Sequence, residues 1–135
     1  MNAKHPYRFI NWAQNESCTA AHFFQPESVN EIQSIIAKAD KVRIVGSGHS
    51  WSSICLSNHT LINLDRFNQV LELDTVKMKV RVQPGIKLWQ LNEYLDSKGF
   101  ALTNLGSISK QSVAGAISTG THGSGKNYQI LGSQV

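Results

Sequence analysis

Apolar residues recur every three or four positions between residues 29 and 39, and this spacing predicts an amphipathic helix. Ser28 stands directly before it and Glu31 follows three positions later, which is the pattern of an N-terminal capping box. A second helix is predicted over residues 87–98, where leucines recur on one helical face. The small residues at 112–119 predict one or two further helical turns.

Shorter runs of apolar or alternating residues, bounded by turn-forming residues, predict strands. These runs lie at residues 42–45, 60–64, 70–74, 78–83 and 100–103. The third and fourth runs are close enough to form a hairpin, and residues 130–135 resemble the start of another strand. The pattern as a whole predicts one α+β domain over residues 1–135, built on a small sheet flanked by helices and incomplete at its C-terminal end.

The composition of this 135-residue chain is that of a globular protein, with 41% hydrophobic and 16% charged residues. No apolar run approaches the roughly 20 residues of a membrane span, and the first residues lack the apolar segment of a secretory signal. Cys18 and Cys55 lie far apart without a CxxC motif, which favours free thiols in a reducing compartment. We therefore expect a cytoplasmic protein without a membrane span.

The net charge of +4 arises from basic residues that are scattered along the chain. Nucleic-acid binding is therefore not expected, because such binding usually needs a clustered basic face. The charge distribution is uneven in another way, since residues 98–135 contain no Asp or Glu but keep Lys98, Lys110 and Lys126. This half of the chain could lie beside an anion without like-charge repulsion.

The stretch from Gly46 to Trp51 reads GSGHSW and begins like the dinucleotide fingerprint GxGxxG. Trp51 replaces the third glycine and no long apolar helix follows, so a Rossmann site is a poor interpretation. A GxG after a strand is most often only a tight turn. A turn alone, however, does not require the His49, Ser50 and Trp51 side chains that follow it.

The stretch from Gly120 to Asn127 reads GTHGSGKN and nearly matches the phosphate-binding P-loop pattern. Asn127 replaces the hydroxyl residue that would bind magnesium, and the strand-loop-helix context of a P-loop is missing. Nucleotide hydrolysis is therefore not expected from this motif.

Each glycine-rich segment carries one histidine, His49 in the first and His122 in the second. A metal site would need a third ligand, and the second segment offers no carboxylate or thiol. We expect no metal site. Two acid-poor, glycine-rich segments suggest instead one extended anionic ligand that both segments bind, with backbone amides holding a diphosphate.

At this point the motifs match a known family. Three segments carry the match: Asn11-Trp12-Ala13 with Pro26-Glu-Ser-Val29, residues 42–50, and residues 107–125. They resemble, in order, the N-terminal FAD-binding part of the vanillyl-alcohol-oxidase-like (PCMH-type) flavoproteins. Within that family the chain is most similar to the aldonolactone and alditol oxidases.

The resemblance implies that the glycine-rich loop wraps the FAD diphosphate and that His49 is bonded covalently to the 8α carbon of the flavin. A neutral imidazole nitrogen is chemically suited to that bond. The residues that the resemblance assigns to the cofactor are Ile44, Val45, Gly46, Ser47, Gly48, His49, Ser50, Ser107, Ser112, Gly115, Thr119, Gly120, Thr121 and His122. Gly106, next to this set, would leave room for oxygen near the flavin, or would only serve a turn.

The activity that the resemblance implies is FAD-dependent oxidation of a sugar-lactone or polyol hydroxyl with oxygen as the electron acceptor. In that family the substrate is oriented by a cap domain that is absent from these residues. No catalytic residue is therefore assigned, and the 135-residue chain alone is expected to be inactive. The alternatives are a non-catalytic or truncated flavin-binding module, a structural fragment that binds no flavin, and a fragment similar to UDP-N-acetylenolpyruvoylglucosamine reductase.

Overall fold

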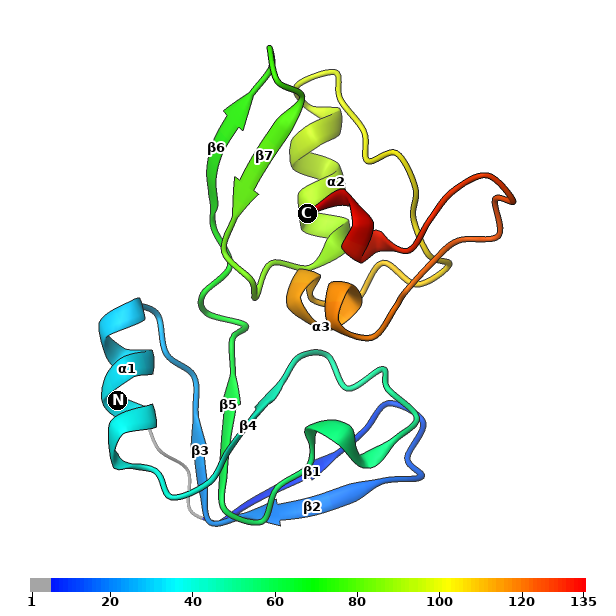
Figure 1. The fold of residues 1–135 in the computed structure, drawn as a ribbon. Coiled ribbons are helices and arrows are strands. Elements are labelled where there is room, and N and C mark those ends of the chain that lie inside the picture. Colours follow the sequence, from blue (N-terminus) through cyan, green and yellow to red (C-terminus); the bar gives the residue numbers. More distant parts are fainter. Residues whose placement is uncertain (1–5) are drawn as a thin grey trace. The chain divides into compact units, whose positions relative to one another are not determined.

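The computed structural model describes residues 6–135, which form two compact units (Figure 1). The first unit ends at Phe67, and the second comprises Asn68–Val135. Each unit combines helices with a small sheet of its own, so the predicted α+β class is confirmed.

The first unit is built on a parallel sheet of three strands in the order β3-β5-β4. The strands are β3 (His22–Phe24), β4 (Val42–Val45) and β5 (Thr60–Asn63). All four residues of β5 are buried, because this strand is central and both faces of the sheet are covered. The parallel pairing places the carboxyl ends of β4 and β5 at the same edge, where Val45 lies opposite Asn63.

A helix covers one face of this sheet and a hairpin covers the other (Figure 1). Helix α1 (Val29–Lys38) buries Ile35 against Ile62 and Leu64. On the opposite face, Ala20 of the hairpin packs with Leu61 and other buried side chains. The hairpin consists of β1 (Tyr7–Ile10) and β2 (Ser17–Ala20), which pair antiparallel.

The N-terminus of α1 is capped as the sequence predicts, with one difference. The Ser28 hydroxyl accepts a hydrogen bond from the Glu31 N–H at 3.3 Å. The Glu31 carboxylate accepts from the N–H of Glu27, one residue before the cap, and not from that of Ser28. Both side chains still satisfy backbone donors at the start of the helix, which is the physical function of a capping box.

The second unit begins with an antiparallel hairpin of β6 (Val70–Asp74) and β7 (Lys79–Val82). Helix α2 (Leu88–Asp96) packs against it through Leu91 and Leu95. Beyond α2, the short helix α3 (Val113–Ser118) and the 3₁₀ helix η2 (Leu131–Gln134) complete the unit. A second cluster joins these elements, and its buried members are Leu88, Ala116 and Leu131.

Two predicted strands are wrong. Residues 100–103 form no strand because they pair with no other strand; Phe100 and Leu102 instead pack against the core beside α2. Residues 131–134 form η2 and not the start of a strand, because Leu131 is buried beside α3 and its N–H donates to Thr121 O at 2.7 Å.

The sequence pattern also missed the three strands β1, β2 and β3, which are only three or four residues long. In the described part of the chain, no helix has the length and apolar character needed to cross a membrane.

Candidate functional site

The loop that follows β4, residues 46–53, is the first of the two glycine-rich segments. Gly48 is buried and has a φ of 70°, in the left-handed region that favours glycine. A Cβ atom added there would lie 3.0 Å from Phe9 Cζ, so a side chain would also press against the β1–β2 hairpin. The loop therefore needs a glycine at position 48 for both its backbone conformation and its packing.

The turn between β1 and β2 binds this loop on both sides of His49. The Trp12 N–H donates to Gly48 O at 2.8 Å, and Asn11 Nδ2 donates to Ser50 O at 2.9 Å. Asn15 Nδ2 donates to the next carbonyl, Trp51 O, at 3.1 Å. Three carbonyl groups that flank His49 are thus held by one short turn.

A second asparagine holds the beginning of the same loop. Asn63, at the end of β5, places its Nδ2 3.4 Å from the carbonyl oxygens of both Val45 and Gly46. Its Oδ1 accepts from Gln25 Nε2 at 3.1 Å and from Asp65 N at 3.0 Å. Asn63 is buried, and these contacts satisfy both its donor and its acceptor group.

The bound carbonyls determine which way the loop's peptide groups face. In a trans peptide the C=O and N–H point in opposite directions. Since the carbonyls of residues 45, 46, 48, 50 and 51 are turned toward protein donors, the N–H groups of the residues that follow each of them are turned the other way. A loop whose carbonyls are bound by the protein, and that contains no acidic residue, is chemically compatible with an anion such as a diphosphate.

His49 stands among aromatic side chains. The centre of its ring lies 5.5 Å from the ring centre of Trp12, and Trp12 in turn makes an edge contact with Trp51. Both tryptophans are largely exposed, at 59% and 68%, whereas the Nδ1 atom of His49 is buried. Two exposed tryptophans beside a loop histidine form an apolar surface that a planar ring could cover.

The second glycine-rich segment lies in the second unit and centres on α3. Ser112 caps this helix: its buried hydroxyl accepts from Gly115 N at 3.4 Å. A Cβ atom at Gly115 would approach Ser112 Oγ to 3.2 Å, so the glycine leaves room for the cap. Thr119, at the other end of α3, donates its hydroxyl to Gly115 O at 2.8 Å.

The chain after α3 lies against the segment before it. A Cβ atom at Gly106 would be 3.1 Å from Thr121 Cγ2 and 3.4 Å from His122 O, so close packing is itself a sufficient reason for this glycine. Thr121 Oγ1 accepts from Gln111 Nε2 at 3.1 Å. The His122 ring is exposed, and its Nδ1 lies 2.9 Å from Gly123 O.

The predicted cofactor residues thus fall into two groups, 44–50 in the first unit and 107–122 in the second. Within the first group, the Ile44 side chain is exposed and Val45 is buried in the core. Within the second, Ser107 is exposed and Gly120 has a φ of 65°. The assignment of these residues to a cofactor stays a prediction.

The sequence alone gives no role to the residues that hold the loop. Asn11 and Trp12 belong to a motif that carries the family resemblance, whereas Asn15 and Asn63 belong to none of its motifs. No local signal identifies Asn11, because its partner Ser50 lies 39 positions away. Asn63 cannot be assigned a role from the sequence either, because its acceptors Val45 O and Gly46 O lie 18 and 17 positions away.

Other parts of the described chain offer less chemistry. No group of three or more His, Cys, Asp or Glu side chains among residues 6–135 could hold a metal ion. Burial raises the pKa of the Cys55 thiol; a backbone hydrogen bond opposes this, and the neighbouring Cys18 adds to it. Both cysteines are free thiols, as the sequence predicts.

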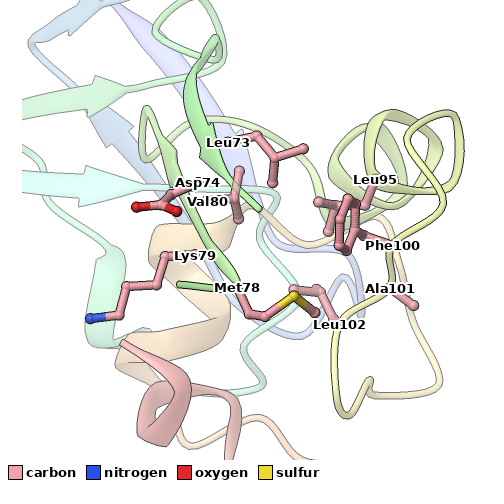
Figure 2. Close-up of a pocket in the computed structure, with 9 residues that line it drawn as sticks. All are labelled: Leu73, Asp74, Met78, Lys79, Val80, Leu95, Phe100, Ala101 and Leu102. Carbon is pink, nitrogen blue, oxygen red and sulfur yellow. The ribbon is translucent and has the colours of Figure 1, made fainter. Parts of the chain in front are cut away.

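A small cavity lies in the second unit between the β6–β7 hairpin and the chain after α2 (Figure 2). Met78 extends across it toward Leu102, Leu95 lines it from α2, and Phe100 lines it from the chain after α2 (Figure 2). Its volume of about 60 Å³ is far below the roughly 300–1,000 Å³ of ligand pockets. This cavity is therefore a gap in the packing and not a cofactor site.

Comparison with known proteins points to one family. A family model described as "FAD binding domain" matches residues 20–135. The chain is 44% identical to a D-arabinono-1,4-lactone oxidase of Kluyveromyces lactis, over 98% of the chain and 27% of that protein. It is 40% identical to an L-gulonolactone oxidase of Mus musculus, over 95% of the chain and 30% of that protein. The chain therefore spans between a quarter and a third of the length of these relatives.

Solved structures agree on the fold. A solvent-stable cholesterol oxidase superposes with a TM-score of 0.74 at 21% identity, over 90% of this chain and 25% of that one. An alkyldihydroxyacetonephosphate synthase superposes with a TM-score of 0.68 at 26% identity, over 78% of this chain and 22% of that one. The resemblance predicted from the motifs is confirmed by these matches.

Proposed function

Because the chain belongs to the family of FAD-binding domains, we propose that it is the cofactor-binding part of an FAD-dependent oxidase that acts on a sugar lactone. The lactone class rests on relatives that are named as arabinonolactone and gulonolactone oxidases. When bound, FAD would accept a hydride from the substrate and pass two electrons to oxygen. The residues of this chain bind and orient the cofactor.

The observation that carries the proposal is the arrangement of the loop after β4. Its carbonyls are bound by Asn11, Trp12, Asn15 and Asn63, which hold the loop in one conformation, and it contains no acidic side chain that would repel the FAD diphosphate. Each charge-assisted hydrogen bond from a loop N–H to the diphosphate would contribute about 1.5–3 kcal/mol. The exposed Trp12 and Trp51 rings add an apolar surface beside His49.

We propose that His49 also holds the cofactor covalently, through a ring nitrogen and the 8α carbon of the flavin. The net change forms one N–C bond and removes one hydrogen from each partner. Both hydrogens, with their two electrons, pass to dioxygen, which becomes hydrogen peroxide. An oxidase that already uses dioxygen therefore needs no further reagent for this attachment.

The residues of the second group, 107–122, are proposed to contact FAD as well. Residues 98–135 contain no acidic side chain, which suits them to an anionic cofactor. Ser112 would act through the backbone it caps, because its hydroxyl is already bound to Gly115 N. A cytoplasmic location is proposed from the two free thiols.

Mass spectrometry of the denatured protein tests the proposal. The full chain is incubated with FAD, and its mass is compared with those of His49→Ala and His122→Ala. The wild-type chain and the His122 variant should carry one FAD after denaturation, because the exposed His122 ring is not the attachment point. The His49 variant should carry none, yet still bind FAD reversibly through the loop amides.

The possible results separate the alternatives. An adduct that survives in His49→Ala would refute the attachment site. Reversible FAD binding without any adduct in the wild-type chain would refute the covalent bond and support a domain that binds flavin non-covalently. A folded chain that binds no FAD would refute the proposed function and favour a structural fragment.

A further inference from the structure

Asn11 is a buried polar side chain beside the candidate site whose donor and acceptor groups are both hydrogen-bonded. It is 3% exposed, and all three of its side-chain hydrogen bonds are made within the protein. Nδ2 donates to Asn15 Oδ1 at 2.8 Å and to Ser50 O at 2.9 Å, while Oδ1 accepts from Glu16 N at 3.2 Å. Its backbone also binds within the turn, since Asn11 N donates to Glu16 O at 3.0 Å.

This set of partners fixes the orientation of the amide group. If the amide were rotated by 180°, Oδ1 would face two acceptors, Ser50 O and Asn15 Oδ1, and Nδ2 would face the Glu16 N–H. Only one orientation satisfies every partner. The position therefore requires a side chain that donates two hydrogen bonds and accepts one at this length, and asparagine meets that requirement.

The bond to Ser50 O acts on the loop and not on the core of the unit. Trp12 N holds the carbonyl before His49, and Asn11 holds the carbonyl after it. The bond from Asn11 to Asn15 orients the second amide, which then donates to Trp51 O. Loss of the Asn11 donor would release the C-terminal side of the loop while the strands and α1 keep their own contacts.

We infer that Asn11 is a positioning residue for the flavin site. By binding Ser50 O and orienting Asn15, it holds residues 48–51 so that His49 and its neighbouring peptide groups are presented to the cofactor in one conformation. The effect of Asn11 on the cofactor rests on the proposed function, but its positioning of the loop can be measured without FAD. Preorganised loops bind better because the cost of ordering them has been met during folding.

The test uses the full chain and three variants. Asn11→Asp keeps the acceptor for Glu16 N and removes both donors. Asn15→Ala removes the hydrogen bond to Trp51 O and one of the two acceptors of Asn11. Because Asn15 is exposed, this variant is less at risk of misfolding than Asn11→Asp. Ile35→Val is the matched control, because it weakens the core between α1 and the sheet and touches nothing in the loop.

The first readout is amide hydrogen exchange in the absence of FAD. The Trp12 N–H reports on the loop, because it donates to Gly48 O. In Asn11→Asp its exchange should rise about 10-fold or more, since the loop that carries its acceptor is no longer held at Ser50 O. Exchange in β4 and β5 should change no more than it does in Ile35→Val, and Asn15→Ala should show a smaller rise at Trp12. Unchanged exchange of the Trp12 N–H in Asn11→Asp would overturn the inference, whatever FAD does.

The second readout is the rate of covalent FAD incorporation at saturating FAD, below the Tm of every variant. Asn11→Asp should be slower than wild type by about 10-fold or more, and Ile35→Val should keep the wild-type rate. Equal rates in these two variants would overturn the inference, because the effect would then be one of stability alone. A rise in loop exchange combined with no FAD binding in the wild-type chain would uphold the positioning and refute the proposed function instead.

Discussion

Gly48 and Gly99 both have positive φ values, of 70° and 77°, but their surroundings differ. A Cβ atom at Gly48 would lie 3.0 Å from Phe9 Cζ and 3.5 Å from Asn11 Cα, whereas nothing lies within 4 Å of one at Gly99. The left-handed conformation disfavours any residue with a side chain, by about 1–2 kcal/mol. A comparison of substitutions at the two positions therefore separates the cost of backbone strain, present at both, from the cost of a steric clash, present only at Gly48.

We predict that Gly99→Ala lowers the free energy of unfolding by about 1 kcal/mol and leaves FAD binding unchanged. Gly48→Ala should cost more, about 2 kcal/mol or more, because the Phe9 ring must move and the turn that holds the loop moves with it. It should also weaken FAD binding. Urea denaturation and FAD titration of both variants measure this. Equal losses of stability would contradict the packing explanation.

The candidate site residues differ in how far they could be predicted from the sequence. His49 is a candidate from the sequence because it follows a strand and a Gly-Ser-Gly turn, all within a few residues. Asn11 could not be assigned a role, because that role depends on Ser50, and the two are brought together only when the β1–β2 turn packs on the loop. The same holds for Asn63, whose acceptors Val45 and Gly46 belong to the neighbouring strand and loop.

At the scale of elements, local signals were reliable and distant pairing was not. Helix α1 and the β6–β7 hairpin were predicted because their periodicity, cap and turn residues are all close in sequence. Strand β3 was missed because it pairs in parallel with β5, and His22 lies opposite Thr60. Such strands are stabilised by partners that a short sequence window does not contain.

The turn of the β6–β7 hairpin depends on one carboxylate. Asp74 Oδ1 accepts from Lys77 N at 2.9 Å and from Val76 N at 3.1 Å, and Oδ2 lies 3.5 Å from Lys77 Nζ. The hydrogen bond from the Lys77 backbone is the main reason that the pKa of Asp74 is lowered. Partial burial raises the pKa, whereas hydrogen bonds from the Lys77 side chain and the Val76 N–H lower it further. The ionised carboxylate therefore stabilises the hairpin.

We predict that Asp74→Ala lowers the Tm at pH 7, and that the difference from wild type shrinks as the pH falls below the ordinary Asp value of about 4. A carboxyl group with a lowered pKa contributes stability above its unfolded pKa and loses it as the pH drops through the folded pKa. Glu72→Ala is the control, since Glu72 pairs only with Arg81 on the hairpin surface, at 3.6 Å. A Tm difference for Asp74→Ala that stayed constant from pH 7 to pH 2 would contradict this role.

At the scale of the whole molecule, the chain consists of two compact units, and each carries one glycine-rich segment. Neither segment contains a carboxylate that could bind a substrate hydroxyl, since residues 46–53 and 98–135 lack Asp and Glu. Glu93 and Asp96, on α2, are exposed. Under the proposed function, we therefore expect a division between cofactor binding by this chain and substrate binding by the remaining length of a protein such as the mouse gulonolactone oxidase, of which this chain covers 30%.

The last prediction follows from that division. The 135-residue chain loaded with FAD should not oxidise aldonolactones or alditols at a measurable rate. Rapid oxidation needs the reacting carbon held about 3–3.5 Å from its acceptor, and a site open to water binds hydroxyl groups weakly and without selectivity. Peroxide release from the loaded chain measures this, with FAD content determined on the same sample so that inactivity is not mistaken for missing cofactor. A longer protein that joins this chain to the remaining length of its relatives is the positive control. Turnover by the chain alone on the order of 1 per second or faster would show that residues 1–135 already contain the groups that orient the substrate.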